Sequence, residues 1–410
     1  MMRVSERPRP IQSLDVLLAN RKIGTILRSP VYAFTFEQDY RERGGVPILS
    51  LSFRSANGEL RQDPKPLAGI LPTFFANLLP EGKLREAMGK HHQGRVRQRN
   101  DFDLLAVLGA DVSGAVQLVP SDGSVLMEKP KAYFSLAGMQ MKLSVAKNRR
   151  EGGGLTLPMD GELGLYIAKF PSATFPGVSE NEFANLALAA AIGMDVPHHE
   201  LVERSDLESI PEELNTHSGG PLLLVRRFDR GADGQRIHIE DFAQVFGVQP
   251  SRKYEGAAFH IAATLNNAVS PEAALEFVRR LALAALTGNG DMHLKNWSLI
   301  YPGDGDRPSL APIYDVLSTV PYIPADAMAL SLGRERSFRA LTAARWKAFA
   351  NRAGLPETAV LEAVVETVTL VNERWWRLPE REVVPANVRG RIDEHLKVMT
   401  PILGTRAQKG

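Results

Sequence analysis

The feature that most constrains this chain is a long apolar helix that must end just before a run of polar residues. Ser270 and Pro271 are typical of a helix N-cap and first helical position, and apolar residues repeat on one face from Leu275 onward. Gly288 is typical of the position at which such a helix ends. The sequence therefore predicts a core helix that delivers Asp291 to a rigid edge.

A β-hairpin is expected directly after this helix. Residues 297–301 have strand character, a turn rich in Gly and Asp follows, and residues 309–314 can form the returning strand. Asn296 and Asp315 lie about equally far from the turn, so they should meet at the open end of the hairpin, close to Asp291. The sequence thus predicts one carboxylate beside a carboxylate-amide pair.

Such a cluster has a chemical interpretation. A hard divalent cation such as Mg²⁺ takes oxygen ligands from one or two side chains and leaves its other positions to phosphate and water. Protein kinases place a catalytic Asp and a metal-binding Asn at the spacing shown by Asp291 and Asn296, and a later Asp supplies the other metal ligand. Taken singly, each residue also suits a turn or a cap. Together, the three polar residues favour a functional site.

Composition excludes several other classes. The chain has 410 residues, enough for two or three packed units, and no Cys, which excludes disulfides and thiolate metal sites. Its formal net charge is only +2, so no overall field requires nucleic acid as a partner. The apolar runs are shorter than a membrane span and the N-terminus lacks an apolar signal core, so we expect no membrane association and a cytoplasmic location.

A first unit is expected over residues 1–125, with a linker near residues 121–130. Within this unit, residues 90–99 form a basic run that suits either a solvated loop or a contact to phosphate or to an acidic partner. No aromatic residue interrupts the run, so base stacking is not expected there.

Two charged residues beyond the linker each have two interpretations. Lys169 ends an apolar strand, either as a surface lysine with a buried stem or as a lysine that pairs with nucleotide phosphates. Glu182 matches a capping box with Ser179, although it could instead be the partner of Lys169. The apolar strand over 221–230 suits either a plain sheet strand or a hinge between lobes against which adenine would pack.

Ten collinear segments resemble the HipA family of toxin-antitoxin serine/threonine kinases, and together they span most of residues 70–320. The matching segments are Phe74–Gly82, Phe102–Leu105, Ser113–Val116, Ser135–Lys142, Ile167–Lys169, Asn181–Glu182, Arg227–Arg230, Lys253–Glu255, Asp291–Asn296 and Tyr314–Asp315. Because ten segments occur in the same order, the resemblance is more specific than any one motif.

The resemblance implies an α+β fold: a two-lobed, protein-kinase-like structure with an additional N-terminal α/β subdomain and a mainly helical C-terminal lobe. The N-terminal subdomain would occupy residues 1–125. The N-lobe with its ATP-binding loop would occupy residues 131–225, and the C-lobe with the catalytic loop and metal site residues 229–410.

The resemblance also implies roles for particular residues. Asp291 would be the catalytic base, Asn296 and Asp315 the Mg²⁺ ligands, and Lys169 a contact to the phosphates of ATP. Further ATP contacts would come from a loop, a hinge and the catalytic segment: Ala137, Gly138, Met139, Gln140, Met141, Lys142, Arg226, Arg227, Phe228, His293, Leu294, Lys295 and Tyr314. Family members autophosphorylate a serine at the start of the loop, here Ser135. A dianionic group beside the phosphate cradle would repel nucleotide and displace the loop.

The function implied is that of a toxin kinase whose target belongs to translation, such as glutamyl-tRNA synthetase, and whose action causes growth arrest and persistence. Its implied partners are a helix-turn-helix antitoxin of the HipB type and, through that complex, operator DNA. A second hypothesis is a kinase-shaped corepressor that acts by binding its antitoxin. A third keeps the chemistry but transfers phosphate to a small molecule.

The sequence departs from the family pattern in two places. The loop has a single Gly, so its phosphate cradle cannot be argued from glycine spacing. Arg226 stands where the best-known members carry an acidic hinge residue. The backbone contact to adenine is therefore still expected, but a hydrogen bond from the side chain of the acidic residue is not. Beyond residue 320 we expect amphipathic helices near 344–353 and 361–376, with Trp375 and Trp376 in a core or an interface.

Overall fold

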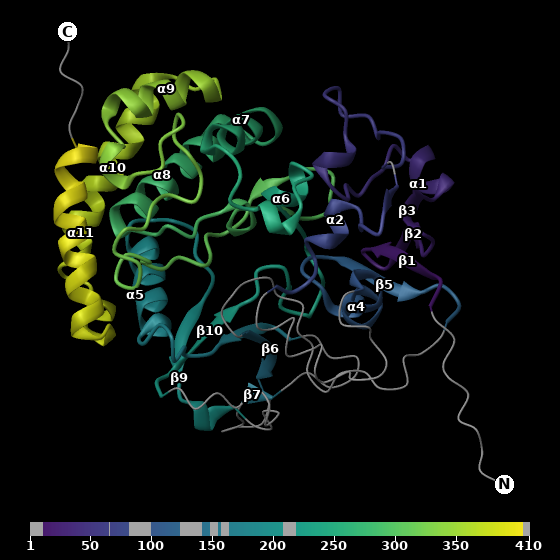
Figure 1. The fold of residues 1–410 in the computed structure, drawn as a ribbon, viewed down its shortest axis with the longest axis horizontal. Coiled ribbons are helices and arrows are strands. Elements are labelled where there is room, and N and C mark those ends of the chain that lie inside the picture. The colour runs from purple at the N-terminus through teal and green to yellow at the C-terminus, as the bar shows by residue number, and fades with distance from the viewer. Residues whose placement is uncertain are drawn as a thin grey trace.

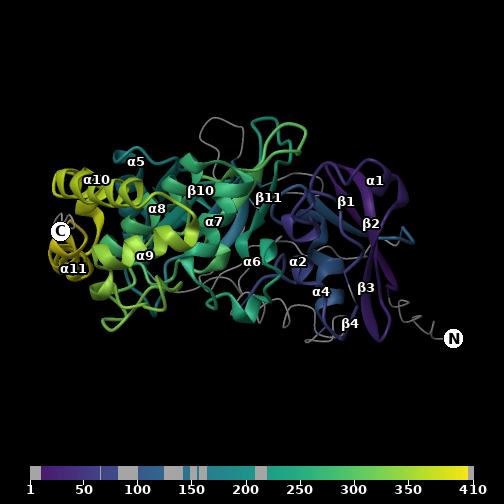
Figure 2. The same ribbon diagram turned by 90° about the horizontal axis from the view of Figure 1, so that it is seen from above.

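The chain is arranged as three layers that follow one another along the molecule. This computed structural model describes residues 11–64, 66–81, 100–123, 142–147, 155–156, 164–207 and 219–404. Seen from above, an N-terminal sheet forms one end, the long C-terminal helices form the other, and the residues between them fill the middle (Figure 2).

The N-terminal unit is a five-stranded antiparallel sheet with short helices packed against it. Alternate residues of its first strand, Leu14, Val16 and Leu18, are buried, as expected for a strand with one face on a core. In spatial order its strands are β4 (Leu67–Ala68), β3 (Val31–Phe36), β2 (Arg21–Leu27), β1 (Ser13–Leu18) and β5 (Val116–Pro120). Its helices are α1 (Gln38–Glu42), α2 (Thr73–Ala76) and α4 (Asp101–Leu108).

A second five-stranded antiparallel sheet lies below the main group of helices in Figure 1. In spatial order its strands are β7 (Leu155–Thr156), β6 (Lys142–Lys147), β8 (Tyr166–Lys169), β10 (Leu222–Arg226) and β9 (His199–Val202). Strand β10 separates two hydrophobic cores. Leu222 and Leu224 join the core shared with the N-terminal unit, while Leu223 and Val225 join the core of the helical lobe.

The remaining residues form a mainly helical lobe. Its helices are α6 (Phe242–Val245), α7 (Ala258–Ala268), α8 (Pro271–Thr287), α9 (Ala343–Ala353), α10 (Glu357–Trp375) and α11 (Ala386–Gly404). Helix α5 (Val178–Ala191), from the preceding segment, packs into the same core. A small sheet of β11 (His238–Asp241), β12 (Ser298–Tyr301) and β13 (Ser309–Leu310) completes the lobe. The expected helices after residue 320 are confirmed, and Trp375 is fully buried whereas Trp376 is partly exposed.

Helix α8 forms as its sequence predicts. The Ser270 side chain accepts a hydrogen bond from the Ala273 N–H at 3.2 Å, Pro271 opens the helix, and Gly288 ends it at φ 69°. The returning strand is shorter than predicted, with 309–310 in place of 309–314. Pro312 has no N–H to donate, and the Ile313 N–H bonds to the Asp195 carbonyl at 2.9 Å, so the chain leaves the ladder there.

Candidate active site

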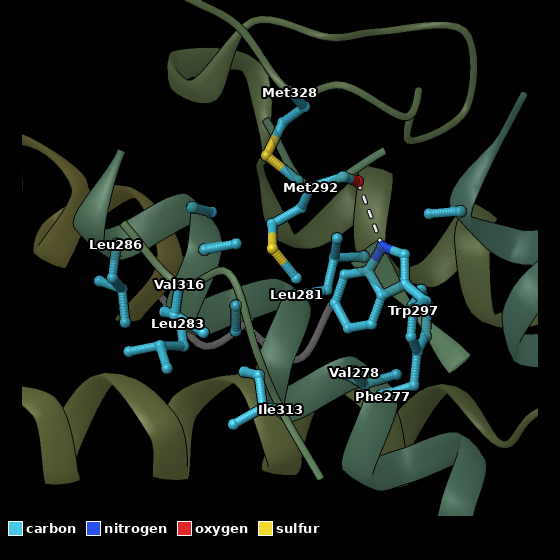
Figure 3. Close-up of a cluster of buried hydrophobic side chains, with 14 of the residues drawn as sticks. Phe277, Val278, Leu281, Leu283, Leu286, Met292, Trp297, Ile313, Val316 and Met328 are labelled. Carbon is cyan, nitrogen blue, oxygen red and sulfur yellow. Dashed lines mark hydrogen bonds between the residues drawn. The ribbon is translucent and has the colours of Figure 1, made fainter. Parts of the chain in front are cut away.

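The polar loop after α8 is held by apolar anchors in the core. Met292 and Leu294 are buried, and the Trp297 indole N–H donates to the Met292 carbonyl at 3.2 Å (Figure 3). The Trp297 ring packs edge-on against Phe277 of α8, with ring centroids 4.5 Å apart. The residues from Met292 to Trp297 are all buried, whereas 40% of the Asp291 side chain is exposed.

Hydrogen bonds fix the conformation of this loop. The Asn296 side-chain amide donates to the Asp291 carbonyl at 2.8 Å, which leaves the Asn296 Oδ1 atom for another ligand. The Asp291 N–H donates to the Asn289 Oδ1 atom at 3.0 Å. Burial raises the pKa of Asp291, while a hydrogen bond from the Tyr254 hydroxyl at 2.5 Å acts in the opposite direction. Burial also lowers the pKa of His293 to about 3, so this ring is neutral at pH 7.

Asp315 lies beside the loop with its backbone in the left-handed region, at φ 53°, which is uncommon for a residue other than Gly. Its carbonyl accepts a hydrogen bond from the Asn289 amide at 3.5 Å. The Tyr314 hydroxyl donates to the Lys295 carbonyl at 2.9 Å, so the residues that precede Asp315 and Asn296 are in contact.

A buried charge cluster joins β8, α5 and Asp315. Lys169 contacts the Glu182 carboxylate at 2.5 Å and also pairs with Asp315, and the Lys142 ammonium lies 3.7 Å from Asp315. Burial opposes ionisation of Asp315, but the ammonium groups of Lys142 and Lys169 outweigh it and hold the pKa of Asp315 well below its usual range. Asp315 is therefore a carboxylate at neutral pH.

These contacts decide between the two interpretations of Lys169 and Glu182. The capping box is wrong, because α5 begins two residues earlier than that motif requires, with Gly177 in place of Ser179 as N-cap. Ser179 then lies inside the helix, where its hydroxyl has no hydrogen-bond partner. Lys169 is not a surface lysine either, since its side chain is only 6% exposed. Glu182 is its partner, as in the second interpretation of that residue.

In the predicted hinge segment, the Arg227 side chain is buried and donates to Asp229 at 2.9 Å. The backbone N–H groups of Arg226 and Arg227 donate to the carbonyls of His198 and Leu165, both at 2.8 Å. The Phe228 and Tyr314 rings lie 5.6 Å apart between their centroids, so these two residues do come together.

Two residues of the catalytic segment have side chains that contact other parts of the fold. The Leu294 side chain is buried in the hydrophobic core. The Lys295 ammonium pairs with Glu81 at 2.8 Å and donates to the Asn77 carbonyl at 3.0 Å. That these two residues contact ATP stays a prediction; the Leu294 side chain is used in packing and the Lys295 side chain is bound to the N-terminal unit.

Several predicted residues lie outside the described residues. They are the autophosphorylation residue Ser135, the loop residues Ala137, Gly138, Met139, Gln140 and Met141, and the basic run over 90–99. Conversely, sequence reasoning assigned no role to Glu81, which pairs with Lys295 of the loop, or to Tyr254, which donates to Asp291. The sequence feature that could have indicated these two residues is their place in segments that carry the family resemblance.

The donor set fits a phosphate-bound cation better than a closed protein cage. Within the ranges that the structure describes, no three His, Asp or Glu side chains are grouped to hold a metal ion. One carboxylate, Asp315, and one amide oxygen, Asn296 Oδ1, are the hard oxygen donors that Mg²⁺ takes when nucleotide phosphates and water complete its coordination.

A buried lysine of a five-stranded sheet pairs with a glutamate of a helix, beside an Asp-x-x-x-x-Asn loop and a later aspartate, and this arrangement defines a protein-kinase-like fold of α+β class. Residues 14–119 match the HipA N-terminal domain, and residues 134–375 match the HipA-like C-terminal domain. The chain belongs to the HipA family.

Two relatives in sequence carry kinase names. A candidate kinase of Sinorhizobium fredii, Y4dM, is 40% identical over 396 residues, which cover 93% of this chain and 96% of the relative. The serine/threonine-protein kinase toxin HipA of Shewanella oneidensis is 28% identical, with 85% of each chain covered.

Among solved structures, the fold is similar to that of Shewanella oneidensis HipA, solved with HipB and operator DNA. The TM-score is 0.74 at 23% identity, and the match covers 95% of this chain and 97% of the other. This likeness supports the two-lobed fold with its N-terminal unit. In the part of the chain that the structure describes, every helix is too short or too polar to cross a membrane.

Proposed function

We propose that this chain is an ATP- and Mg²⁺-dependent serine/threonine protein kinase that acts as the toxin of a type II toxin-antitoxin pair. The observation that supports this most is the Lys169–Glu182 pair, which lies with Asp315 beside the Asp291 loop. A binding protein would not need a buried lysine shared between two carboxylates at this place, because burying unbalanced charge is costly.

In the proposed mechanism, Lys169 and Lys142 would hold the phosphates of ATP, and Asn296 and Asp315 would hold Mg²⁺. The cation would neutralise charge on the phosphates. Asp291 accepts the proton of the acceptor hydroxyl as that oxygen bonds to the γ-phosphorus, the bond from phosphorus to the bridging oxygen breaks, and ADP leaves. Little covalent work falls to the protein, so its main contributions are positioning and charge.

The partners follow from the family. A relative of the same fold has been solved with HipB and operator DNA, which supports a helix-turn-helix antitoxin of that type for this chain and operator DNA bound through it. The proposed acceptor is a component of translation such as glutamyl-tRNA synthetase, so the site of action would be the cytoplasm. Growth arrest and persistence would result from its phosphorylation.

Mass spectrometry of the intact chain tests the chemistry directly. After incubation with ATP and Mg²⁺ we expect a gain of one phosphate, mapped to Ser135 by peptide analysis. The matched control omits Mg²⁺ and adds a chelator, and it should show no gain. If the protein gains no phosphate and hydrolyses no ATP under any of these conditions, the kinase proposal is wrong.

ATP binding can be measured separately from phosphate transfer. ATP with Mg²⁺ should stabilise the wild-type fold by about 2.7 kcal/mol when the ligand is present at a hundredfold excess over its Kd. Lys169→Met should lose most of this gain, because it removes the ammonium group that contacts phosphate. Lys347→Met removes a lysine that lies 3.7 Å from Glu357 on the surface, and it should keep the whole gain. Equal gains in both variants would contradict the role of Lys169.

A further inference from the structure

A short segment that follows the 3₁₀ turn Pro250–Arg252 contacts the catalytic loop at three points. The Lys253 carbonyl accepts a hydrogen bond from the Leu294 N–H at 3.1 Å. The Tyr254 ring lies edge-on to the His293 ring, with centroids 5.0 Å apart. The Tyr254 hydroxyl donates to the Asp291 Oδ1 atom at 2.5 Å. This segment therefore holds both the backbone of the loop and its carboxylate.

The N-terminal unit reaches the same place through Glu81. Its carboxylate contacts the Lys253 and Lys295 ammonium groups, each at 2.8 Å; Lys295 belongs to the catalytic loop and Lys253 to the segment that contacts it. The two lysine side chains are only 8% and 2% exposed. Burial opposes ionisation of Glu81, yet the two ammonium groups outweigh it and lower the pKa of Glu81 to about 2. A charged Glu81 thus ties two segments of the helical lobe to the N-terminal unit.

We propose that Glu81 and Tyr254 are positioning residues for the catalytic base, and that the N-terminal unit thereby contributes to catalysis; this rests on the proposed kinase function. Tyr254 occupies Oδ1 of Asp291 and leaves Oδ2 to accept the proton of the acceptor. The Asp291 side chain is 40% exposed, so without this bond it can rotate among several staggered conformers. Glu81 fixes Lys253, and Lys253 is bonded through the backbone to Tyr254.

This arrangement predicts a particular kinetic defect. Tyr254→Phe keeps the ring against His293 and removes only the hydroxyl, and Glu81→Gln keeps the shape of the side chain and removes its charge. Single-turnover autophosphorylation, followed with radiolabelled ATP and Mg²⁺, should show a maximal rate about tenfold lower in each variant. The ATP concentration at half-maximal rate should stay unchanged, because both variants keep the groups proposed to hold the phosphates and Mg²⁺, which are Lys142, Lys169, Asn296 and Asp315.

A double-mutant cycle shows whether the two residues act together. If Glu81 acts through the Lys253–Tyr254 segment, the double variant should be about as slow as the slower single variant, whereas independent effects would multiply to about a hundredfold. Glu255→Gln is the matched control: it breaks the exposed pair between Arg252 and Glu255, at 2.6 Å, in the same segment, and should leave the rate unchanged.

Each remaining outcome has one meaning. An inactive wild-type chain would refute the kinase proposal itself. With an active wild type that requires Asp291, unchanged rates in both single variants would refute the positioning role alone. A faster Tyr254→Phe variant would also refute it, because Tyr254 would then be blocking the base. Thermal unfolding of each variant separates these results from misfolding, since a merely structural role lowers the midpoint and leaves the rate of the folded fraction unchanged.

Discussion

Replacement of Asp291 by alanine is expected to abolish both autophosphorylation and growth arrest. The Asp291 backbone N–H donates to the Asn289 side chain and its carbonyl accepts from the Asn296 side chain, and Trp297 anchors the loop in the core of the helical lobe. A positioned general base contributes about 10²- to 10⁴-fold to the rate, so the residual activity should fall below detection in most assays. Asp315→Ala should have the same outcome for a different reason, because it removes the carboxylate proposed to hold Mg²⁺.

The measurement pairs phosphate incorporation in vitro with growth after expression in the absence of antitoxin. Asp306→Ala is a matched control, since this aspartate lies on the exposed turn of the same hairpin. It should keep both activities. Undiminished incorporation by Asp291→Ala would refute the assignment of the base. Growth arrest that persists without Asp291 would instead favour the alternative of a corepressor that acts by binding.

The parts of this site that sequence reasoning predicted are those determined by local chemistry. Ser270, Pro271 and Gly288 delimit α8 because capping and the left-handed conformation depend on single residues. The position of the loop after this helix and its approach to Tyr314 follow from chain geometry alone. The family resemblance then supplied the fold, which the comparisons confirm.

Sequence reasoning reached its limit where a partner from another element determines the contacts of a charged side chain. Glu182 satisfied a local capping pattern, but its actual partner, Lys169, lies on a strand of the sheet. Arg227 follows the hinge strand, yet its guanidinium binds Asp229 and lies 3.6 Å from Asp111 of the N-terminal unit. A local pattern cannot reveal such pairs, because the free energy of a buried charge depends on what the whole fold places beside it.

The buried pairing of Asp229 with Arg227 and Arg230 has the largest expected effect on stability. The Asp229 carboxylate is buried and accepts hydrogen bonds from both Arg227 and Arg230 at 2.9 Å and from the Gly114 N–H at 2.8 Å. Asp229→Ala leaves two buried guanidinium groups with Asp111 as their remaining close carboxylate. Breaking a buried ion pair in this way costs about 3–5 kcal/mol, so we expect the free energy of unfolding to fall by that amount.

Asp39 provides the control for this prediction, because it also binds two arginines, Arg21 at 2.7 Å and Arg43 at 2.9 Å, but its side chain is 60% exposed. Asp39→Ala should cost about 1 kcal/mol or less in the same denaturant titration. Burial opposes ionisation of Asp229, but the arginines outweigh it and hold its pKa below the ordinary value of 3.8. The ionised Asp229 therefore contributes its full stabilisation above pH 3.8, and this contribution is lost as the pH falls through the lowered pKa. The difference in free energy of unfolding between wild type and Asp229→Ala should accordingly become smaller in acid. Equal losses for the two aspartates at neutral pH would show that burial of this network does not determine its contribution to stability.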